Sequence, residues 1–484
     1  MYENYGLFIE SRWRPAGSGE TRAVVSPVTG EPVGHVPNAA AGDIDTALAG
    51  AEAAFSVWRA VPAWERGRTL AKASSLIRMR ADAIARMIST ETGKPLAESM
   101  GEINATADQF EWYGEEAKRI YGQIIPGRNA TDRMSVTYQP VGVCLSLSAW
   151  NFPALLPGRK IAAALAAGCS VIARPASEAP GACFAIAQAL MDAGLPSGVL
   201  TILTGDPGPI SERLIASPVV RKVSLTGSVR VGKHILSLCA AGMKKVTMEL
   251  GGHAPVIVHA DADPVATAER VAAAKFRNGG QVCISPSRFY VHVKIKREFE
   301  AAFKSFAEKL VIGDGLSEGV TMGPLIRPSA VEQSLGLVED AVKHGAKLLT
   351  GGRRPSQFNK GNFLEPTVLT DVPDEARIMQ EEPFAPVAPI AGFSRLDDVI
   401  RRANSVPFGL ASYVFTHDDA LAALTAEGID AGMVGVNETM LATAEAPFGG
   451  IKESGFGREG GSLGIMDYLE PKYIRHRLVV RGAV

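Results

Sequence analysis

The sequence predicts an α/β fold in more than one domain, on three observations. First, between residues 141 and 250 short apolar runs typical of strands alternate with helical stretches. Second, a further series of the same kind runs from Pro255 to about Asn437. Third, a chain of 484 residues is long enough for two or three domains. Such alternation predicts mainly parallel sheets covered by helices, with ligands at the carboxyl ends of the strands.

The first α/β series is preceded by segments of a different kind. Residues 1–40 carry short apolar pieces broken by proline and glycine, which predict a few strands. Apolar stripes at helical spacing then predict three long helices, at 44–60, 63–91 and 96–117. We interpret their charged residues, such as Glu65, Arg66 and Arg68, as a solvated face. Residues 123–142 alternate in part and predict an extended hairpin, which needs something to pack on, such as another subunit.

Within the first series each expected element has its own boundaries. The expected strands are 143–148, 170–173, 199–203, 223–226 and 246–250, and the expected helices lie near 154–167, 180–193, 209–217 and 229–242.

Composition excludes several classes of function. The chain has 50 Lys and Arg against 51 Asp and Glu, so no overall field draws it to nucleic acid or an anionic membrane. Its five cysteines include no C-x-x-C pair, which disfavours a disulfide framework and a metal site alike. No export signal opens the sequence, and the apolar run at 161–173 is too short to span a bilayer. We expect a cytoplasmic protein whose partners are small molecules and copies of itself.

The stretch from Phe276 to Ser285 presents a cysteine, Cys283, in what we expect to be a loop. Gly279 and Gly280 let the backbone turn tightly and approach a ligand. A cysteine in a loop is, on its own, more often an inert small hydrophobe than a nucleophile.

Three further positions combine a strand end with a reactive or polar side chain. The segment from Thr226 to Gly232 follows a strand and opens a helix, so its N–H groups could hold a phosphate or simply be capped. Glu249 ends a strand before two glycines and could be a general base or a salt-bridged carboxylate. Asn151 precedes Pro153 and could donate to an oxyanion or cap a helix. Each residue alone is ambiguous.

Taken together, these residues resemble the aldehyde dehydrogenase superfamily over nearly the whole chain. Six of its motifs occur in the family's order, namely Trp150-Asn151-Phe152-Pro153, Leu225-Thr226-Gly227-Ser228, Glu249-Leu250-Gly251-Gly252, Gly280-Gln281-Val282-Cys283, Glu382-Pro383-Phe384-Ala385-Pro386 and Pro447-Phe448-Gly449-Gly450. Leu225 stands where the family often has phenylalanine.

The resemblance implies two Rossmann-like α/β domains and a small β oligomerisation segment. Residues 1–122 and 143–250 would form the cofactor-binding domain, and residues 251–443 the catalytic domain. Residues 123–142 and 470–484 would form the oligomerisation segments. A homo-oligomer, dimer or tetramer, is therefore expected.

The resemblance also implies a mechanism that oxidises an aldehyde to an acid with a nicotinamide cofactor. Cys283 would attack the aldehyde carbon as a thiolate, so its pKa must be lowered locally. Asn151 and the backbone N–H of Cys283 would hold the oxyanion. Glu249 would activate the water that hydrolyses the thioester, and Lys160 would assist it.

The cofactor would be held by residues that match the family's positions. The implied contacts are Trp150, Arg174, Pro175, Ser177, Gly227, Ser228, Leu250, Glu382 and Phe384. Ser177 stands where NAD-preferring members often carry an acid, and serine beside a guanidinium tolerates a 2′-phosphate. NADP is therefore slightly favoured over NAD, although Glu178 could restore the repulsion.

The substrate class depends on two arginines. Arg159 and Arg277 match positions at which the succinate-semialdehyde dehydrogenase branch clamps the substrate's distal carboxylate, and Thr443 falls where that branch uses a serine. Succinate semialdehyde is favoured over glutarate semialdehyde, a keto-acid semialdehyde or a general aldehyde.

Two readings outside this class stay open at this point. A cofactor-independent thiol hydrolase or acyltransferase would pair Cys283 with His253 or His234. A nucleotide-binding protein without catalysis would keep the fold but show no reactive thiol.

Overall fold

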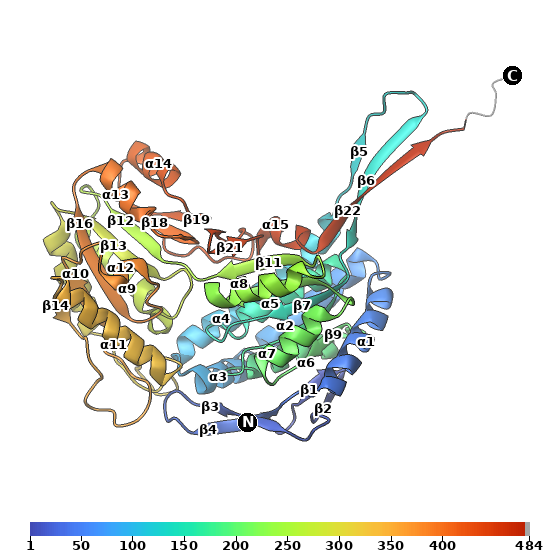
Figure 1. Cartoon of the computed structure of the whole chain (residues 1–484), viewed down its shortest axis with the longest axis horizontal. Helices are drawn as coiled ribbons and strands as arrows, with labels where there is room; N and C mark the ends of the chain where they lie inside the picture. The colour runs from blue at the N-terminus through green and yellow to red at the C-terminus, as the bar shows by residue number, and fades with distance from the viewer. Residues whose placement is uncertain (480–484) are drawn as a thin grey trace.

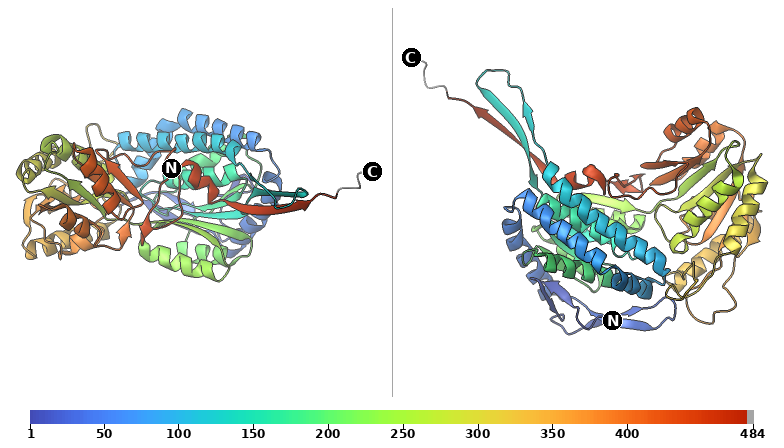
Figure 2. Two further views of the ribbon diagram at one scale, coloured as in Figure 1. Left: turned by 90° about the horizontal axis from the view of Figure 1, so that it is seen from above. Right: turned by 180° about the vertical axis from the view of Figure 1, so that it is seen from behind.

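The structure, a computed structural model, describes residues 1–479 as two α/β lobes beside one another (Figures 1 and 2). An arm built of strands projects from the first lobe, and the N-terminal strands run along the side opposite the arm. Within the described residues no helix is both long and apolar enough to cross a membrane.

The first lobe is organised around an eight-stranded sheet in the order β2-β1-β9-β8-β7-β10-β11-β21. Its strands are β1 (Leu7–Ile9), β2 (Arg12–Arg14), β7 (Val143–Leu147), β8 (Ser170–Arg174), β9 (Leu200–Ile202), β10 (Val220–Gly227), β11 (Lys245–Leu250) and β21 (Gly455–Phe456). The five central strands from β9 to β11 are all parallel, whereas β1, β2 and β21 pair antiparallel at the edges. The carboxyl ends of those five strands therefore meet at one edge of the sheet.

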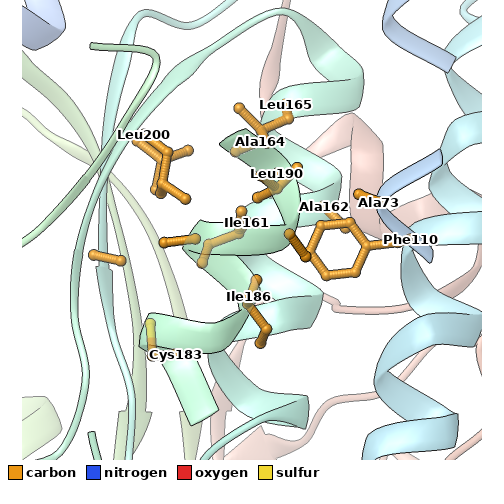
Figure 3. Close-up of a cluster of buried hydrophobic side chains, with 14 of the residues drawn as sticks. Ala73, Phe110, Ile161, Ala162, Ala164, Leu165, Cys183, Ile186, Leu190 and Leu200 are labelled. Atoms are coloured by element: carbon orange, nitrogen blue, oxygen red, sulfur yellow. The ribbon is translucent and has the colours of Figure 1, made fainter. Parts of the chain in front are cut away.

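Helices cover both faces of this sheet. They are α1 (Ala41–Trp58), α2 (Ala63–Met79), α3 (Ala81–Thr92), α4 (Leu96–Glu116), α5 (Leu155–Ala167), α6 (Gly181–Ala193), α7 (Pro207–Ala216) and α8 (Val229–Ala240), with the one-turn η1 (Ala117–Arg119) after α4. One apolar core lies between the sheet and α5, α6 and α4, where Ile161, Ile186 and Phe110 interlock (Figure 3). Small alanines along α5 let the neighbouring helices approach closely, so this face is tightly packed.

Two sequence expectations for the early helices were wrong. The single helix expected at 63–91 is two helices, because Arg80 leaves the helical conformation at φ −100° and ψ 9° and its guanidinium pairs with Asp192 at 2.6 Å. Arg66 is not on a solvated face. It is buried and donates to the carbonyls of Ala166 and Val61.

The second lobe carries a seven-stranded sheet in the order β14-β15-β16-β13-β12-β18-β19. Its strands are β12 (Ala254–Val258), β13 (Pro286–His292), β14 (Lys347–Thr350), β15 (Thr367–Thr370), β16 (Val387–Phe393), β18 (Ala411–Phe415) and β19 (Met433–Val436). Its helices are α9 (Pro264–Phe276), α10 (Lys296–Glu308), α11 (Pro328–Lys343), α12 (Arg377–Gln380), α13 (Leu396–Ala403) and α14 (Asp419–Gly428). All neighbours in this sheet are parallel except β14 and β15.

The arm is a three-stranded antiparallel sheet in which β22 (Leu469–Arg477) pairs along the whole of β6 (Asp132–Pro140) and β5 (Gln123–Ile125) pairs with its other side. Most of β22 is exposed. Residues 480–484, the end of the expected C-terminal segment, lie outside the described residues.

Short elements join these three parts. They are the hairpin of β3 (Thr21–Val25) and β4 (Pro32–Pro37), the pair β17 (Phe408–Gly409) and β20 (Ile451–Lys452), the turn η2 (Arg277–Gly280) and α15 (Gly461–Met466). After residue 443 the chain returns to the first lobe, where Gly455 of β21 lies opposite Glu249 of β11.

Candidate active site

Polar side chains of the first lobe gather where its parallel strands end. Asn151 follows β7, Ser177 follows β8, Ser228 follows β10 and Glu249 is the penultimate residue of β11. Because these strands are parallel neighbours, the four residues share one edge of the sheet, which faces the second lobe.

The loop that carries Cys283 is folded tightly between α9 and β13. Its backbone is left-handed at three successive residues, Asn278, Gly279 and Gly280, with φ of 50°, 60° and 73°. A Cβ on Gly280 would lie 2.2 Å from the carbonyl oxygen of Ala385, so only glycine fits that position. The loop thereby holds the half-buried Cys283 against the first lobe.

Asn151 is fixed directly beside this loop. Its side chain is buried, and its Nδ2 donates to the carbonyl oxygen of Gln281 at 3.1 Å. Since an amide nitrogen carries two hydrogens, one of them stays available for a ligand oxygen. The structure thus brings together the thiol and the amide, which are far apart in the sequence.

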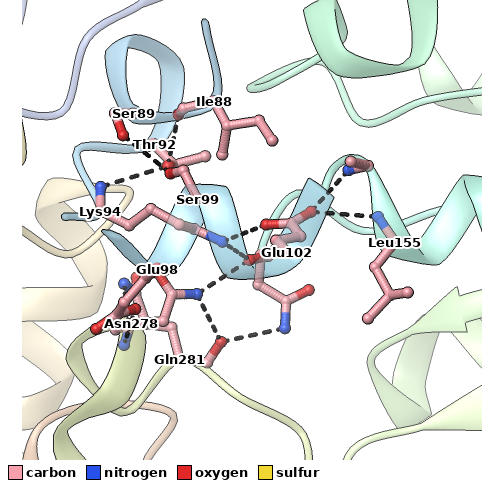
Figure 4. A network of polar contacts seen from close by, with 12 residues as sticks. Ile88, Ser89, Thr92, Lys94, Glu98, Ser99, Glu102, Leu155, Asn278 and Gln281 are labelled. Carbon is pink, nitrogen blue, oxygen red and sulfur yellow. Dashed lines mark hydrogen bonds and ion pairs between the residues drawn. The ribbon is translucent and has the colours of Figure 1, made fainter. Parts of the chain in front are cut away.

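A buried ion pair between Lys94, in the loop that precedes α4, and Glu102 of α4 holds the backbone of Asn151 in place (Figure 4). Lys94 Nζ donates to the carbonyl oxygen of Asn151 and to Glu102 Oε2, both at 2.7 Å. Asn278 Nδ2 donates to the same carbonyl at 3.0 Å. Glu102 Oε1 in turn accepts the N–H groups that begin α5, those of Ala154 and Leu155. Sequence reasoning missed this pair, because Lys94 lies in the short segment between two expected helices and Glu102 is one charge within an apolar helical stripe.

Glu249 is almost completely buried, and neither of its carboxylate oxygens has a hydrogen-bond partner among the described residues. Burial raises the pKa of Glu249 to about 7, helped by the negative charge of Glu459, while Lys160, Arg159 and the nearby Cys283 thiol act in the opposite direction. A carboxyl group with this pKa exists in both protonation states near neutral pH, as a general base requires.

Lys160 connects this carboxylate to a second one that sequence reasoning did not single out. Its ammonium forms an ion pair with Glu459 and donates to the Thr226 hydroxyl. Burial would raise the pKa of Glu459, but Lys160 and Arg159 outweigh it and lower that pKa. Glu459 therefore stays ionised.

The surroundings of Cys283 contradict one expectation from the sequence. Its pKa is raised well above the ordinary value, first by burial and then by the charges of Glu249 and Glu382, and Arg159 offsets this only in part. Without ligands the group is a thiol at neutral pH, so deprotonation must accompany the reaction.

Cys283 lies in the wall of a cavity of about 240 Å³ between the lobes. Arg159 and Arg277 also line it, together with Phe152 and Phe448. The Arg159 guanidinium is only 2% exposed and stacks on Phe448 at 4.6 Å, while Arg277 stacks on Phe152 at 5.3 Å.

Arg159 forms an ion pair with Glu459 that is too long to be a hydrogen bond. Its Nε and Nη1 have no hydrogen-bond partner among the described residues, and the nearest carboxylate oxygen, Oε2 of Glu459, is 3.6 Å away. Thr443 is not among the residues that line this cavity. Two residues of the same loop, Met440 and Ala442, line it instead.

A larger groove of about 480 Å³ runs along the strand ends on the other side of Trp150. Trp150, Arg174, Gly227 and Ser228 line it. Phe384 stands at the end of the groove near the site, where its ring meets that of Trp150 edge-on at 5.8 Å.

The sequence profile of the aldehyde dehydrogenase family matches residues 13–474 of this chain. The chain belongs to the aldehyde dehydrogenase family. It is 43% identical to a glutarate-semialdehyde dehydrogenase of Pseudomonas putida and 42% identical to an NADP(+) succinate-semialdehyde dehydrogenase of Escherichia coli, each alignment covering 96% of both chains. A crystal structure titled as an E. coli NADP-dependent enzyme superposes with a TM-score of 0.96, at 42% identity and 98% coverage of both chains. The protein is therefore an NAD(P)-dependent aldehyde dehydrogenase with the expected α/β fold.

The large groove fits the nicotinamide dinucleotide of an aldehyde dehydrogenase. Two buried polar atoms on its wall, Ser148 Oγ and Arg174 Nε, have no hydrogen-bond partner among the described residues, as expected where a polar ligand completes the site. Near the start of α8, the Ser228 hydroxyl accepts the N–H of Val231 and caps the helix that faces the groove.

Four further expected cofactor contacts, Pro175, Ser177, Leu250 and Glu382, are not among the residues that line this groove. Arg174 Nη2 donates to the Ser177 hydroxyl at 2.7 Å, and Pro175 is buried between them. Glu382 Oε1 accepts the N–H of Gly252 at 3.1 Å. Leu250, the last residue of β11, has a buried side chain. Its contact with a cofactor would therefore be made by its backbone.

The histidines of the hydrolase reading are not available to the Cys283 thiol of this dehydrogenase. His253 is buried, and its two ring nitrogens are engaged by Ser287 Oγ and the carbonyl oxygen of Ile378. His234 lies on the wall of the dinucleotide groove instead. The thiol therefore faces a carboxylate, as an aldehyde dehydrogenase requires, and not an imidazole.

Proposed function

We propose that this aldehyde dehydrogenase oxidises succinate semialdehyde to the diacid and prefers NADP to NAD. The observation that carries the substrate assignment is Arg159, a buried guanidinium with two unpartnered nitrogens beside the cavity that holds Cys283. Leaving such donors without partners costs free energy, so an anionic group that occupies the cavity regains it. Arg277 supplies a second positive charge on the same wall.

The first chemical step belongs to Cys283, Glu249 and Asn151. Glu249, with a pKa of about 7, takes the proton of the buried thiol as Sγ bonds to the aldehyde carbon. The carbonyl π electrons move to the oxygen, where Asn151 Nδ2 and the N–H of Cys283 donate to it. A donor of this kind contributes about 3–4 kcal/mol to the transition state. A nicotinamide held in the groove would supply the hydride acceptor, and the oxidised carbon would remain bonded to Cys283 as a thioester.

Hydrolysis of that thioester again requires a base. Glu249 first releases its proton, and the positive charge of Lys160, which opposes the rise that burial causes in the pKa of Glu249, assists this release. Glu249 then takes a proton from water as the water oxygen bonds to the acyl carbon and the C–S bond breaks. The sulfur recovers a proton from Glu249, and the carboxylic acid leaves.

The cofactor preference rests on the end of the groove that follows β8. Gly227 and Ser228 would hold the pyrophosphate, and Glu382 and Phe384 the nicotinamide ribose and ring. Ser177 cannot repel a 2′-phosphate as a carboxylate would, and Arg174 beside it is a cation with a spare donor. An NADP(+) enzyme among the relatives agrees with this preference.

A homo-oligomer is part of the proposal. The arm leaves the first lobe with its apolar residues uncovered, since Ile124 is 90% exposed and Tyr473 56% exposed. Exposed apolar strands of this kind favour pairing with another copy.

All five cysteines are free, which agrees with the reducing cytoplasm as the compartment.

Initial rates over a panel of aldehydes test this function. Succinate, glutarate and keto-acid semialdehydes are compared with hexanal and benzaldehyde, with NAD and NADP in parallel, by the absorbance of the reduced cofactor. The proposal expects the highest kcat/KM with succinate semialdehyde and NADP, and no turnover in Cys283→Ala. Glutarate semialdehyde is the competing assignment because a relative is named for it.

The carboxylate clamp has its own control. Arg159→Met should lower kcat/KM for succinate semialdehyde by about 10²-fold, as expected for a lost charge-assisted contact, and change that for hexanal far less. If the native enzyme had a higher kcat/KM for hexanal or benzaldehyde than for the semialdehydes, the assignment of a carboxylated substrate would be wrong.

A further inference from the structure

Glu178 and Arg327 form an ion pair that joins the two lobes across the dinucleotide groove. Glu178 follows β8 of the first lobe, and Arg327 directly precedes α11 of the second. The Glu178 side chain is 23% exposed and that of Arg327 57% exposed, so solvent screens the pair only in part. Among the residues that line this groove, Arg327 is contributed by the second lobe.

The pair lies at the end of the groove where the nucleotide's ribose would be read. Glu178 is the neighbour of Ser177, whose hydroxyl accepts from Arg174 at 2.7 Å, and both Glu178 and Arg174 line the groove. An unpaired carboxylate here would repel a phosphate on the ribose 2′-hydroxyl. The acid that is missing at position 177, where this chain has serine, is thus present one residue later as Glu178.

We propose that Arg327 is a specificity-determining residue that makes this site accept a 2′-phosphate by neutralising Glu178. The inference rests on the proposed use of NADP and names the residue that permits it. With Arg327 in place, the groove end carries one neutralised acid and the free cation of Arg174. Without Arg327, the charge of Glu178 would cancel that of Arg174, and the advantage of the 2′-phosphate would be lost.

Binding of nucleotide fragments to the full-length protein tests this assignment without relying on turnover. Isothermal titration gives the affinities of adenosine 2′,5′-bisphosphate and of 5′-AMP, which differ only in the 2′-phosphate. Arg327→Ala should weaken the bisphosphate about fivefold, a modest change because the pair is partly exposed. The affinity for 5′-AMP should stay within about twofold, since it lacks the group that Glu178 repels.

Two further variants separate the mechanism from a general loss of structure. In the double variant Arg327→Ala with Glu178→Gln, the preference for the bisphosphate should return to the native ratio. Arg327→Lys, which keeps the charge, should retain it. As a matched control, Arg395→Ala removes an exposed arginine that pairs with Asp397 at 2.7 Å and does not line the groove, and it should leave both affinities unchanged.

The outcomes distinguish this inference from the proposed function. An unchanged ratio of the two affinities in Arg327→Ala, or an equal loss of both, overturns the role of Arg327 while leaving the dehydrogenase assignment intact. A ratio that Glu178→Gln does not restore overturns neutralisation as the mechanism. If the native protein bound neither fragment, the proposed cofactor groove itself would be wrong, and the inference would fall with it.

Discussion

The Lys94 ammonium and the backbone carbonyl of Asn151 are joined by a 2.7 Å hydrogen bond. Lys94 lies between α3 and α4, 57 residues before its partner, and shares its charge with buried Glu102. The position of the Asn151 backbone is therefore set by an ion pair, one member of which, Glu102, also lines the cavity that holds Cys283. A buried pair of this kind contributes little net stability while intact, but breaking it leaves an uncompensated charge.

Replacing Lys94 by methionine is expected to destabilise the protein and to slow catalysis. The unpaired carboxylate of Glu102 should lower the free energy of unfolding by about 3–5 kcal/mol, measured by chemical denaturation. Release of the Asn151 carbonyl should also lower kcat, by up to about 10²-fold, because the amide is no longer aligned with the oxyanion. The double variant with Glu102→Gln, whose amide oxygen still accepts the N–H groups of α5, should recover most of the stability.

The control for this pair is an exposed one. Lys343 and Glu339 are 3.0 Å apart at 70% and 69% exposure, and Lys343→Met should change the free energy of unfolding by less than about 0.5 kcal/mol. A loss in Lys94→Met no larger than in this control would contradict a structural role for the buried pair.

Glu249 predicts the pH dependence of turnover. Burial raises its pKa to about 7, and only its ionised form can accept a proton, so kcat should rise as pH increases through about 7. Glu249→Gln should be nearly inactive and should lack this limb. Steady-state rates between pH 5.5 and 9 at saturating substrate check the prediction. A limb near 7 that persisted in Glu249→Gln would assign it to another group.

The thiol of Cys283 should react slowly with iodoacetamide in the protein without cofactor. Its pKa lies well above the ordinary value, so the rate of alkylation should still be rising above pH 9. Glu249→Gln removes a negative charge beside the sulfur and should shift the midpoint of the rate profile to lower pH. Arg159→Met removes the opposing positive charge and should shift it upward.

Peptide mapping by mass spectrometry separates Cys283 from the other cysteines, which are buried. Among these, Cys183 and Cys239 have pKa values raised by burial, to about 12 and about 11, and should label more slowly than Cys283 because they are less accessible to the reagent. A midpoint for Cys283 at or below neutral pH would show that the described charges do not control the thiol.

Much of the site could be predicted from the sequence because three of its polar residues lie at strand ends. Asn151, Ser228 and Glu249 follow apolar runs whose alternation with helices already indicated parallel strands, and parallel strands end at one edge. The tight turn before Cys283 was visible in two glycines, whose left-handed backbone the structure confirms.

The parts that could not be predicted depend on contacts between distant segments. Lys160 meets Glu459 across 299 positions, and no local pattern reveals which charge will be buried with which. The break at Arg80 was invisible for a similar reason, since the apolar stripe continues on both sides of one non-helical residue. The direction of the Cys283 pKa shift follows first from burial and then from carboxylates on other strands and loops, and spacing along the chain places neither.

Lys275, near the end of α9, gives a prediction about stability. Its side chain is completely buried, and its Nζ has no hydrogen-bond partner among the described residues. Burial lowers the pKa of Lys275 to about 7, with Glu382 opposing the shift. Between pH 7 and the ordinary lysine value of 10.5 the unfolded chain therefore binds more protons than the folded one, and stability due to this group rises with pH.

Lys275→Met should therefore stabilise the protein at pH 6–7 by about 1–4 kcal/mol, since it removes a buried group that must otherwise lose its charge or its solvation. Its advantage should shrink as pH rises toward 10, by at most about 1.4 kcal/mol per pH unit. Chemical denaturation at several pH values measures both trends, and the exposed Lys309→Met serves as the control. An advantage that stayed equal from pH 6 to pH 10 would mean that the methionine acts by packing alone. If the pKa of Lys275 is lowered in the folded protein, the difference in the free energy of unfolding between the two proteins must depend on pH.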